Sequence, residues 1–394
     1  MNKLKVLDFI NKNIDWERKL SSPPYNLIIK QKYPFILLKY NQIESDMSNE
    51  IVQECRGLIL KQINIALARN PLIPQYKVAS MRFVKFFNYG QKEAARLSFP
   101  CEVSEKIDGS LIGVWYDNEY GWQVSTSGNI DAEDSPVIFG EYKSYRDIFD
   151  KAWDNKFFDE MNKNCTYIFE LVSPYTRIIV PYKEISLYLL SIRNNITLEE
   201  EARDEIPFIA KKLFGDKIKT PQSFKCNSIE EVKSFVNNLT IESENFEGFV
   251  LCDNNFNRIK LKSPAYMELF FIKGEGIFSE KKIIKLILEG QDDDVLGYFP
   301  EYKEDFDKIR RGLSLLITHF KDLLNKGEKY RSLNKKDFAI WAKEFQYNNL
   351  LFKAYGANYW EKDDENKATF LKQYVENITI SKLVDFVRGE LENE

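Results

Sequence analysis

The pattern of hydrophobic residues changes near residue 266. Before that point, short runs of β-branched and aromatic residues are bounded by Gly, Asn, Asp and Pro, which is typical of antiparallel strands and hairpins. After it, apolar residues repeat at helical spacing, as in Phe306, Ile309, Leu313, Leu316, Ile317, Phe320, Leu323 and Leu324. The sequence therefore predicts an α+β fold. We expect residues 1–265 to form a domain of antiparallel sheets flanked by helices, and residues 266–394 to form an all-α domain whose apolar stripes are its own core.

Individual elements can be predicted from the same pattern. Strands are expected at 34–40, 56–60, 102–107, 110–117, 122–127, 167–172, 177–182, 185–192, 246–252 and 257–262, with Asp117–Gly121 as a hairpin loop. Helices are expected at 143–163 and 228–239. Ser228 and Glu231 have the spacing of a capping box at the start of the second helix.

Composition limits the chemistry that is available. The net charge is −4 over 394 residues, so any nucleic acid must bind a local basic groove rather than the field of the whole molecule. Five dispersed cysteines without Cys-x-x-Cys spacing disfavour a disulfide framework and a zinc site, and favour a reducing cytoplasm. No apolar run suits a signal peptide or a membrane span, so we expect a cytoplasmic protein without a membrane partner.

The lone histidine, His319, lies in a helical stretch far from other polar clusters. We expect it to be a helix-surface or packing residue. Its isolation excludes Ser-His-Asp, Cys-His and His-rich metal chemistry. Catalysis must then come from lysine, arginine, carboxylates and a hard metal ion.

A lysine precedes an Asp-Gly pair in the segment Glu105-Lys106-Ile107-Asp108-Gly109-Ser110, between two strand-like runs. The alternative interpretation of such a segment is a polar turn in a β-hairpin. A lysine in this setting indicates a covalent nucleotidyltransferase, in which the amine carries a nucleotide. Because an amine attacks phosphorus only when it is unprotonated, such a lysine needs burial or nearby positive charge.

Candidate cations occur at Arg56, Lys260 and Lys262. Lys260 and Lys262 are two residues apart in a predicted strand, so both can point into one cleft and clamp phosphates. The alternative for this pair is a solvated edge strand, where lysines discourage aggregation.

Two carboxylates, Glu170 and Glu247, are flanked by strand-forming hydrophobic residues. An unpaired charge is costly there unless it engages a cation, a ribose hydroxyl or a metal-bound water. The alternative is that each belongs to a buried ion pair.

Several sequence blocks together resemble the covalent nucleotidyltransferases, and most closely the phage RNA ligase 1 family. The blocks are ECRG at 54–57, KFFN at 85–88, KIDGSL at 106–111, FELVSPYTRIIVPY at 169–182, EGFV at 247–250 and KLKSPAY at 260–266. They occur in family order over nearly the whole first domain. The helical second domain also resembles that family.

The resemblance implies a role for each matching residue. Lys106 takes AMP from ATP as a phosphoramidate. The positions that contact the nucleotide or its phosphates are Tyr40, Arg56, Lys85, Glu170, Lys260 and Lys262, and Glu247 matches the acidic position that orients the metal or the lysine. Asp293, in the acidic turn at 290–294, matches a metal-associated aspartate, and its alternative is a solvated turn. Phe87 is expected to pack near the nucleotide or in the core. The implied cofactors are ATP and Mg²⁺, with Mn²⁺ as an alternative to Mg²⁺.

The implied substrate is RNA with 5′-phosphate and 3′-hydroxyl ends. The family suggests repair of nicked tRNA in the cytoplasm of a phage-infected cell, with the helical domain choosing the RNA and no obligate protein partner. One departure is Ser127, where the family commonly has a lysine before Gly128. Because of this difference, a non-catalytic RNA-binding or scaffold protein of the same fold remains an alternative. DNA ligases and capping enzymes share the Lys-x-Asp-Gly chemistry, but usually continue into an OB-fold rather than helices.

Overall fold

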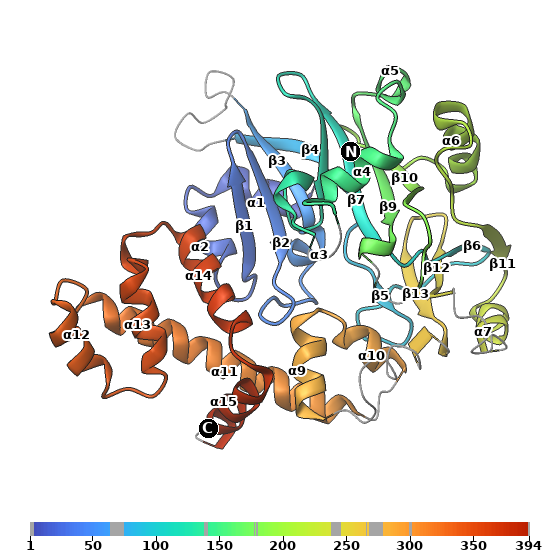
Figure 1. The fold of residues 1–394 in the computed structure, drawn as a ribbon. Helices are drawn as coiled ribbons and strands as arrows, with labels where there is room; N and C mark the ends of the chain where they lie inside the picture. The colour runs from blue at the N-terminus through green and yellow to red at the C-terminus, as the bar shows by residue number, and fades with distance from the viewer. Residues whose placement is uncertain are drawn as a thin grey trace. The chain divides into compact units, whose positions relative to one another are not determined.

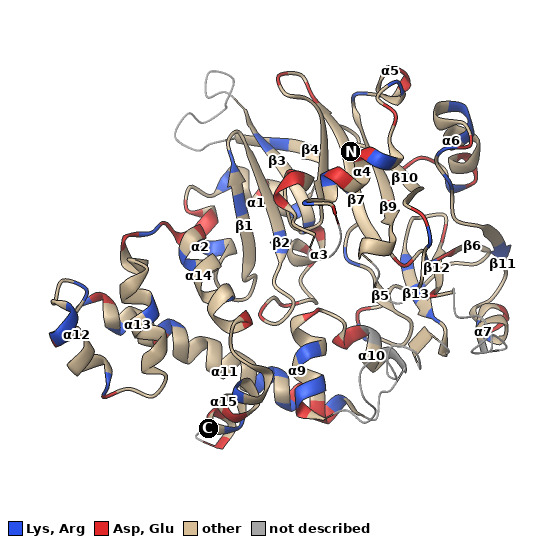
Figure 2. Ribbon diagram, viewed as in Figure 1, with Lys and Arg blue, Asp and Glu red and all other residues tan. Residues whose placement is uncertain are grey.

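The structure, a computed structural model, describes residues 4–63, 75–137, 141–176, 178, 180–237, 246–264, 266–267, 279–298 and 302–392. The chain divides into two compact units. The first comprises residues 1–276 and 293–298, and the second comprises 277–292 and 299–394. Residues of both charge signs are scattered over the elements of each unit (Figure 2), in keeping with the nearly balanced composition.

Three sheets make up the described β-structure of the first unit (Figure 1). One has the order β1 (Leu27–Lys32), β2 (Phe35–Tyr40), β3 (Arg56–Ile63) and β4 (Gln75–Ser80). Another has the order β10 (Ser186–Asn194), β9 (Cys165–Val172), β7 (Ser110–Asp117) and β8 (Gly121–Thr126). The last has the order β11 (Ser223–Cys226), β6 (Cys101–Glu105), β12 (Gly248–Cys252), β13 (Arg258–Lys262) and β5 (Phe87–Asn88). All described pairings are antiparallel except β13 with β5.

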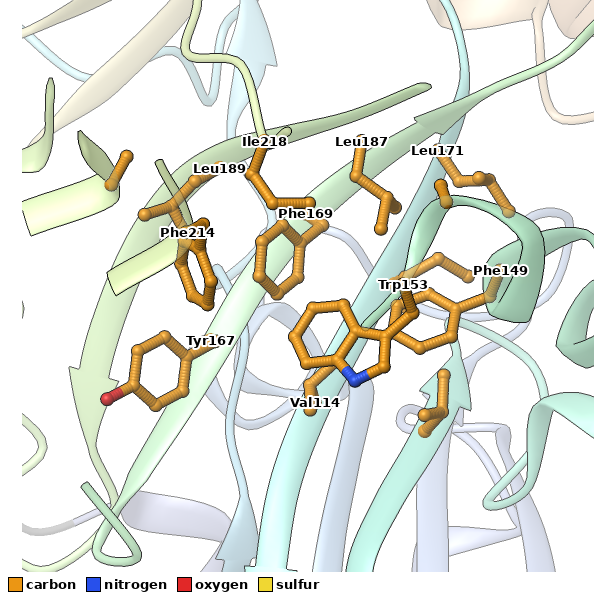
Figure 3. Close-up of a cluster of buried hydrophobic side chains, with 14 of the residues drawn as sticks. Val114, Phe149, Trp153, Tyr167, Phe169, Leu171, Leu187, Leu189, Phe214 and Ile218 are labelled. Carbon is orange, nitrogen blue, oxygen red and sulfur yellow. The ribbon is translucent and has the colours of Figure 1, made fainter. Parts of the chain in front are cut away.

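Helices cover these sheets and close their cores. They are α1 (Lys5–Lys12), α2 (Trp16–Leu20), α3 (Glu50–Glu54), α4 (Tyr145–Ala152), α5 (Phe157–Glu160), α6 (Ile206–Phe214), α7 (Ile229–Asn237) and α10 (Asp292–Tyr298). Trp153, Phe169 and Phe214 lie together in one hydrophobic core, with ring centroids 5.7–5.9 Å apart (Figure 3). A smaller core, which includes Phe35 and Trp115, joins the sheet of β1–β4 to the sheet of β7–β10.

The single helix expected at 143–163 is wrong, because the chain forms α4 and α5 with a break between them. Ser144 and Asp147 begin α4 with a reciprocal capping box. At Trp153 the backbone becomes extended, with φ −94° and ψ 154°, and the indole packs on Phe149 at 4.9 Å. Burial of this large ring therefore outweighs continuation of the helix. The second expected helix is α7, although residues 238–239 lie outside the described residues.

The strand expected at 177–182 is also not present where the structure describes the segment. Residues 178 and 180 are bends, 181–182 have no regular structure, and 177 and 179 lie outside the described residues. Val180 instead donates its backbone N–H to the buried carboxylate of Asp108 over 2.8 Å. This segment serves the loop after β6 rather than a sheet.

In the second unit, the described elements are helices. They are α9 (Glu280–Leu288), α11 (Lys303–Glu328), α12 (Lys335–Ala342), α13 (Asn348–Gly356), α14 (Asp364–Glu376) and α15 (Ile380–Glu392). The predicted apolar stripe of α11 is buried, apart from Ile317, which is partly exposed. Gly312 lets α15 approach α11, because a Cβ there would lie 2.6 Å from Val387. These helices thus use their apolar faces for their own core, as predicted.

His319 lies on α11, where its Nδ1 is 3.0 Å from Glu390 Oε1 and its ring packs on Tyr347. All five cysteines are free and buried. Within the described ranges, no helix combines the length and apolar character needed to cross a bilayer.

Candidate active site

The turn after β6 places Lys106 beside Glu247. The backbone N–H of Lys106 donates to the carbonyl of Gly248 over 2.8 Å, which continues the pairing of β6 with β12. Glu247 directly precedes that glycine. Its Oε2 lies 2.6 Å from Lys106 Nζ, and 23% of the Lys106 side chain is exposed. The amine therefore faces a buried carboxylate and is still reachable from solvent.

Glu247 also pairs with a second lysine. Gly248 is opposite Lys262 in the β12–β13 register, and Lys262 Nζ lies 3.0 Å from Glu247 Oε1. Glu247 and Lys262 are 2% and 7% exposed. The buried ion pair considered for Glu247 is thus present. It is shared between Lys106 and Lys262, so that two cations flank one carboxylate.

Asp108 fixes the Lys106 loop from beneath, a contact that sequence analysis did not predict. Its carboxylate accepts hydrogen bonds from the Val180 N–H over 2.8 Å and from the Tyr266 hydroxyl over 3.1 Å. The ring of Tyr266 also lies under Lys262 Nζ, 5.0 Å from its centroid. Asp108 and Tyr266 both fall within the sequence blocks quoted above, and this was the sequence signal from which their contact could have been suspected.

Glu170 lies next to this loop on β9, opposite Leu111. Gly109 permits the close approach, because a Cβ there would be 2.5 Å from the Leu171 carbonyl and 3.0 Å from Glu170 Cγ. Burial raises the pKa of Glu170 to about 8; Glu247 and Asp108 act in the same direction, while Lys106 and Arg56 oppose it. No side-chain hydrogen bond or ion pair to Glu170 occurs among the described residues.

The segment at 85–88 gathers several of the other predicted residues. Phe86 lies under two cations, the guanidinium of Arg56 at 5.0 Å and the ammonium of Lys260 at 5.9 Å from its ring centroid. Lys260 is on β13, between β12 and β5, so the interpretation as a solvated edge strand does not hold. Phe86 was not singled out from the sequence, although it belongs to the KFFN block.

Lys85 joins a third group of predicted residues. Its Nζ lies over the rings of Tyr40 at 5.0 Å and Phe87 at 5.5 Å, and 3.6 Å from Asp293 Oδ2. The carbonyl of Asp293 accepts from Asn88 Nδ2 over 2.9 Å. Phe87 is 4% exposed, which agrees with its alternative as a core residue. Asp293 is therefore partnered rather than a freely solvated turn residue.

Ser127 lies at the end of β8, close to the start of β3. A Cβ on Gly57 would be 2.7 Å from the Ser127 carbonyl oxygen. A basic residue is nevertheless near, because Lys39 Nζ is 3.8 Å from the position that a Cβ on Gly128 would occupy. The departure at Ser127 does not leave this corner without a cation.

The predicted residues thus fall into three neighbouring groups: Lys106, Glu247 and Lys262 with Glu170; Arg56 and Lys260 around Phe86; and Tyr40 and Lys85 with Asp293. Lys260 and Lys262 connect the first two groups through β13, and Arg56 acts electrostatically on Glu170. Such a cluster of cations with a buried carboxylate can hold a polyanion and remove a proton from an amine. A separate cavity of about 520 Å³, lined by Leu4, Asn11, Tyr76 and Lys163 among others, includes none of the predicted residues.

Comparison with known proteins adds an independent finding. A family model described as RNA ligase matches residues 54–266. A protein of Autographa californica nuclear polyhedrosis virus, described as a bifunctional polynucleotide kinase/RNA ligase, is 31% identical over 294 residues, which are 69% of this chain and 38% of the viral protein. An RNA ligase of Rhodothermus phage RM378 is 27% identical over 312 residues, covering 65% of this chain and 68% of the phage protein. The alignment with the solved structure of an archaeal ATP-dependent RNA ligase covers 75% of this chain and 81% of the archaeal chain, with 12% identity and a TM-score of 0.45.

Proposed function

Because this chain belongs to the RNA ligase family, we propose that it joins RNA ends in an ATP-dependent reaction in which Lys106 carries AMP. In this proposal residues 1–265 are the nucleotidyltransferase domain and residues 266–394 select the RNA. The substrate ends are a 5′-phosphate and a 3′-hydroxyl, and the proposed physiological RNA is nicked tRNA. The observation that carries the proposal is the position of Lys106 beside the buried carboxylate of Glu247, which also pairs with Lys262.

In the first step, Lys106 Nζ attacks the α-phosphorus of ATP. A P–N bond forms, the bond from the α-phosphorus to the bridging oxygen breaks, and pyrophosphate leaves. The amine must lose a proton for this attack. Glu247 is placed to accept it, because its carboxylate lies 2.6 Å from Nζ, and Lys262 balances the local charge on the other side.

Two further displacements complete the reaction. An oxygen of the RNA 5′-phosphate attacks the phosphorus of the lysine-bound AMP, the P–N bond breaks, and Lys106 regains its proton. The 3′-hydroxyl then attacks the 5′-phosphate, loses its proton, and expels AMP as the phosphodiester forms. Arg56, Lys85 and Lys260 are proposed to hold the phosphates in line, and Tyr40 and Glu170 to contact the nucleoside.

A divalent metal ion, Mg²⁺ or Mn²⁺, belongs to the proposal. Over the described ranges, no group of three or more His, Cys, Asp or Glu side chains is arranged to hold a metal. Mg²⁺ usually binds through one or two carboxylates and the substrate phosphates, a donor set that Asp293 fits once its carboxylate leaves Lys85. When bound, the metal would neutralise phosphate charge.

Incubation with ATP labelled at the α-phosphate tests the proposal. Wild type should retain label on the protein, and Lys106→Ala should retain none, because no other amine shares its position. Lys92→Ala, at an exposed lysine outside the groups described above, is the matched control and should label like wild type. Equal labelling of Lys106→Ala would overturn the assignment.

The same assay separates the alternatives. A capping-type enzyme would take label from GTP rather than ATP, and a DNA ligase would seal DNA ends in preference to RNA ends. A non-catalytic protein of the same fold would release no pyrophosphate from ATP. We expect ATP labelling, pyrophosphate release and sealing of RNA.

A further inference from the structure

The guanidinium of Arg82 is fully buried beside the site and has no carboxylate partner among the described residues. Arg82 lies between β4 and β5 and is 1% exposed. Nη1 donates to the Ser125 hydroxyl over 3.0 Å and the Ser125 carbonyl over 3.2 Å. Nη2 donates to the carbonyls of Gly57 over 2.6 Å and Thr126 over 2.8 Å. All four acceptors are neutral, so its charge is solvated by dipoles alone.

The chain makes room for this buried cation at two glycines. A Cβ on Gly57 would lie 2.5 Å from Arg82 Nη2, and one on Gly113 would lie 3.0 Å from Nη1. Burial lowers the pKa of Arg82 to about 9, and repulsion from Arg56 acts in the same direction. Guanidinium resists deprotonation, so a site of this kind is stabilised when an anion arrives.

The neighbouring residue that could receive the anion is Arg56. It directly precedes Gly57, whose carbonyl Arg82 holds, and its guanidinium lies over Phe86 in the segment that follows Arg82. Arg56 also makes no ion pair within the described part of the chain. The two arginines therefore repel one another, and neither forms an ion pair with a carboxylate among the described residues. This arrangement favours a polyanion over a neutral ligand.

We propose that Arg82 is a positioning residue whose buried charge, acting through Arg56, makes the site prefer a nucleoside triphosphate over the nucleoside. This inference rests on the proposed function, because that function supplies ATP as the ligand. Arg82 does not touch the nucleotide. It holds the start of β3 and the end of β8 together and adds a positive charge near Arg56 that no carboxylate pairs with among the described residues.

The test compares the affinities of the full-length protein for α,β-methylene-ATP, which cannot be cleaved at the α-phosphate, and for adenosine, by titration calorimetry. Arg82→Gln removes the charge and should lower the preference for the triphosphate by about tenfold or more, with little change for adenosine. Arg82→Lys, measured at about pH 6 so that a buried amine stays protonated, keeps the charge and should keep the preference. Ser125→Ala, which removes one neutral acceptor, is the control and should behave like wild type.

A purely structural role would weaken both ligands equally in Arg82→Gln, and that result would overturn the inference. If Arg82→Gln does not fold, Arg82→Lys decides, because loss of the triphosphate preference in that variant would equally contradict a role of charge. ATP labelling of wild type distinguishes a failure of the proposed function from a failure of the inference about Arg82. No label on Lys106 would contradict the proposed function, whereas normal labelling with an unchanged preference in Arg82→Gln would contradict this inference alone.

Discussion

Lys106, Glu247 and Lys262 form a charged group whose net charge depends on one carboxylate. If Glu247 takes the proton from Lys106, Glu247→Gln should slow formation of the lysine-bound AMP by about 100-fold, a typical effect for a general base. The defect should shrink as the pH rises, because hydroxide can then remove the proton instead. Rapid-quench labelling at pH 7 and pH 9 measures both effects. A defect that is the same at both pH values would assign Glu247 a role in alignment rather than proton transfer.

Glu170 should make stability depend on pH. Its pKa is raised to about 8, above its unfolded value, so the folded protein holds a proton that the unfolded chain has lost at intermediate pH. The stability from this group is complete below the unfolded pKa of about 4.3 and is lost as the pH rises through about 8. As the pH rises between these limits, the free energy of unfolding of Glu170→Gln should therefore increase relative to that of wild type by roughly 2 kcal/mol. This is less than the full pKa shift would give, because the carboxyl is partly exposed.

Calorimetric unfolding of wild type and Glu170→Gln from pH 5 to pH 8.5, without nucleotide or metal, checks this expectation. Glu184→Gln, at an exposed carboxyl, is the control and should leave the pH profile unchanged. Parallel profiles for wild type and Glu170→Gln would contradict the raised pKa. The sequence marked Glu170 as a costly charge between hydrophobic residues, but only the fold shows that Glu247 pairs with lysines and that Glu170 does not.

At the scale of elements, the β12–β13 hairpin depends on Gly248. Its φ is +151°, and a Cβ would lie 2.2 Å from the Leu261 carbonyl oxygen. Gly248→Ala should push the strands apart and separate Glu247 from Lys262, destabilising the protein by on the order of 3 kcal/mol. Gly121 is the control, because its φ is +71° but no atom lies within 4 Å of a Cβ there. Gly121→Ala should cost only about 1 kcal/mol.

Thermal unfolding and ATP labelling of both glycine variants measure this difference. Gly248→Ala should lose labelling together with stability, because the Lys106 backbone bonds to the Gly248 carbonyl. Equal stability of the two variants would show that the hairpin can yield at Gly248 without cost.

Sequence analysis predicted most strands within a few residues but missed β1, β4, β5 and β11. β3, β7 and β9 carry continuous apolar runs and were expected within a few residues. β5 has two residues, and three of the four residues of β11 are exposed, so neither leaves a clear pattern of period two. The helices α1, α2, α3 and α6 were not predicted, although α1 buries Val6 and Ile10 against the first sheet.

The candidate site was predicted from motifs rather than from periodicity, and this limits what could be foreseen. Within the sequence blocks, the residues predicted to belong to the site were mainly those whose charge could bind a phosphate. No role was predicted for Arg82 or Asp108, because their roles arise from contacts with residues far away in sequence: Ser125 for Arg82, and Val180 for Asp108. Long-range hydrogen bonds of this kind leave no local signal.

For the whole molecule, the change of pattern near residue 266 indicated two parts but could not show that residues 293–298 return to the first unit. The return is explained by Asp293, which contacts Lys85 and Asn88 of that unit. The apolar pattern of this short acidic helix does not indicate its partner, and only the resemblance, which matched Asp293 to a metal-associated aspartate, pointed to the site. A chain ending at 276 would lack these contacts, and one ending at 298 would keep them.

This difference predicts which part of the chain is needed for labelling with ATP. A protein of residues 1–298 should label with ATP within about threefold of the full chain, because it contains every residue proposed to hold the nucleotide. A protein of residues 1–276 should label at least about tenfold less, since Lys85 and Asn88 lose Asp293. Full-length Asp293→Ala separates loss of this side chain from loss of the whole segment.

Sealing of nicked tRNA, unlike labelling with ATP, should depend on the helical unit, because the proposal gives RNA selection to that unit. Residues 1–298 should retain labelling but seal nicked tRNA at least about tenfold more slowly than the full chain, while unstructured RNA should be affected less. Gel assays on both RNAs, with lysine-bound AMP formed beforehand, isolate the sealing steps. Equal sealing of nicked tRNA by residues 1–298 and by the full chain would mean that the helices do not choose the substrate. Recognition of the RNA would then have to lie on the unit that carries Lys106.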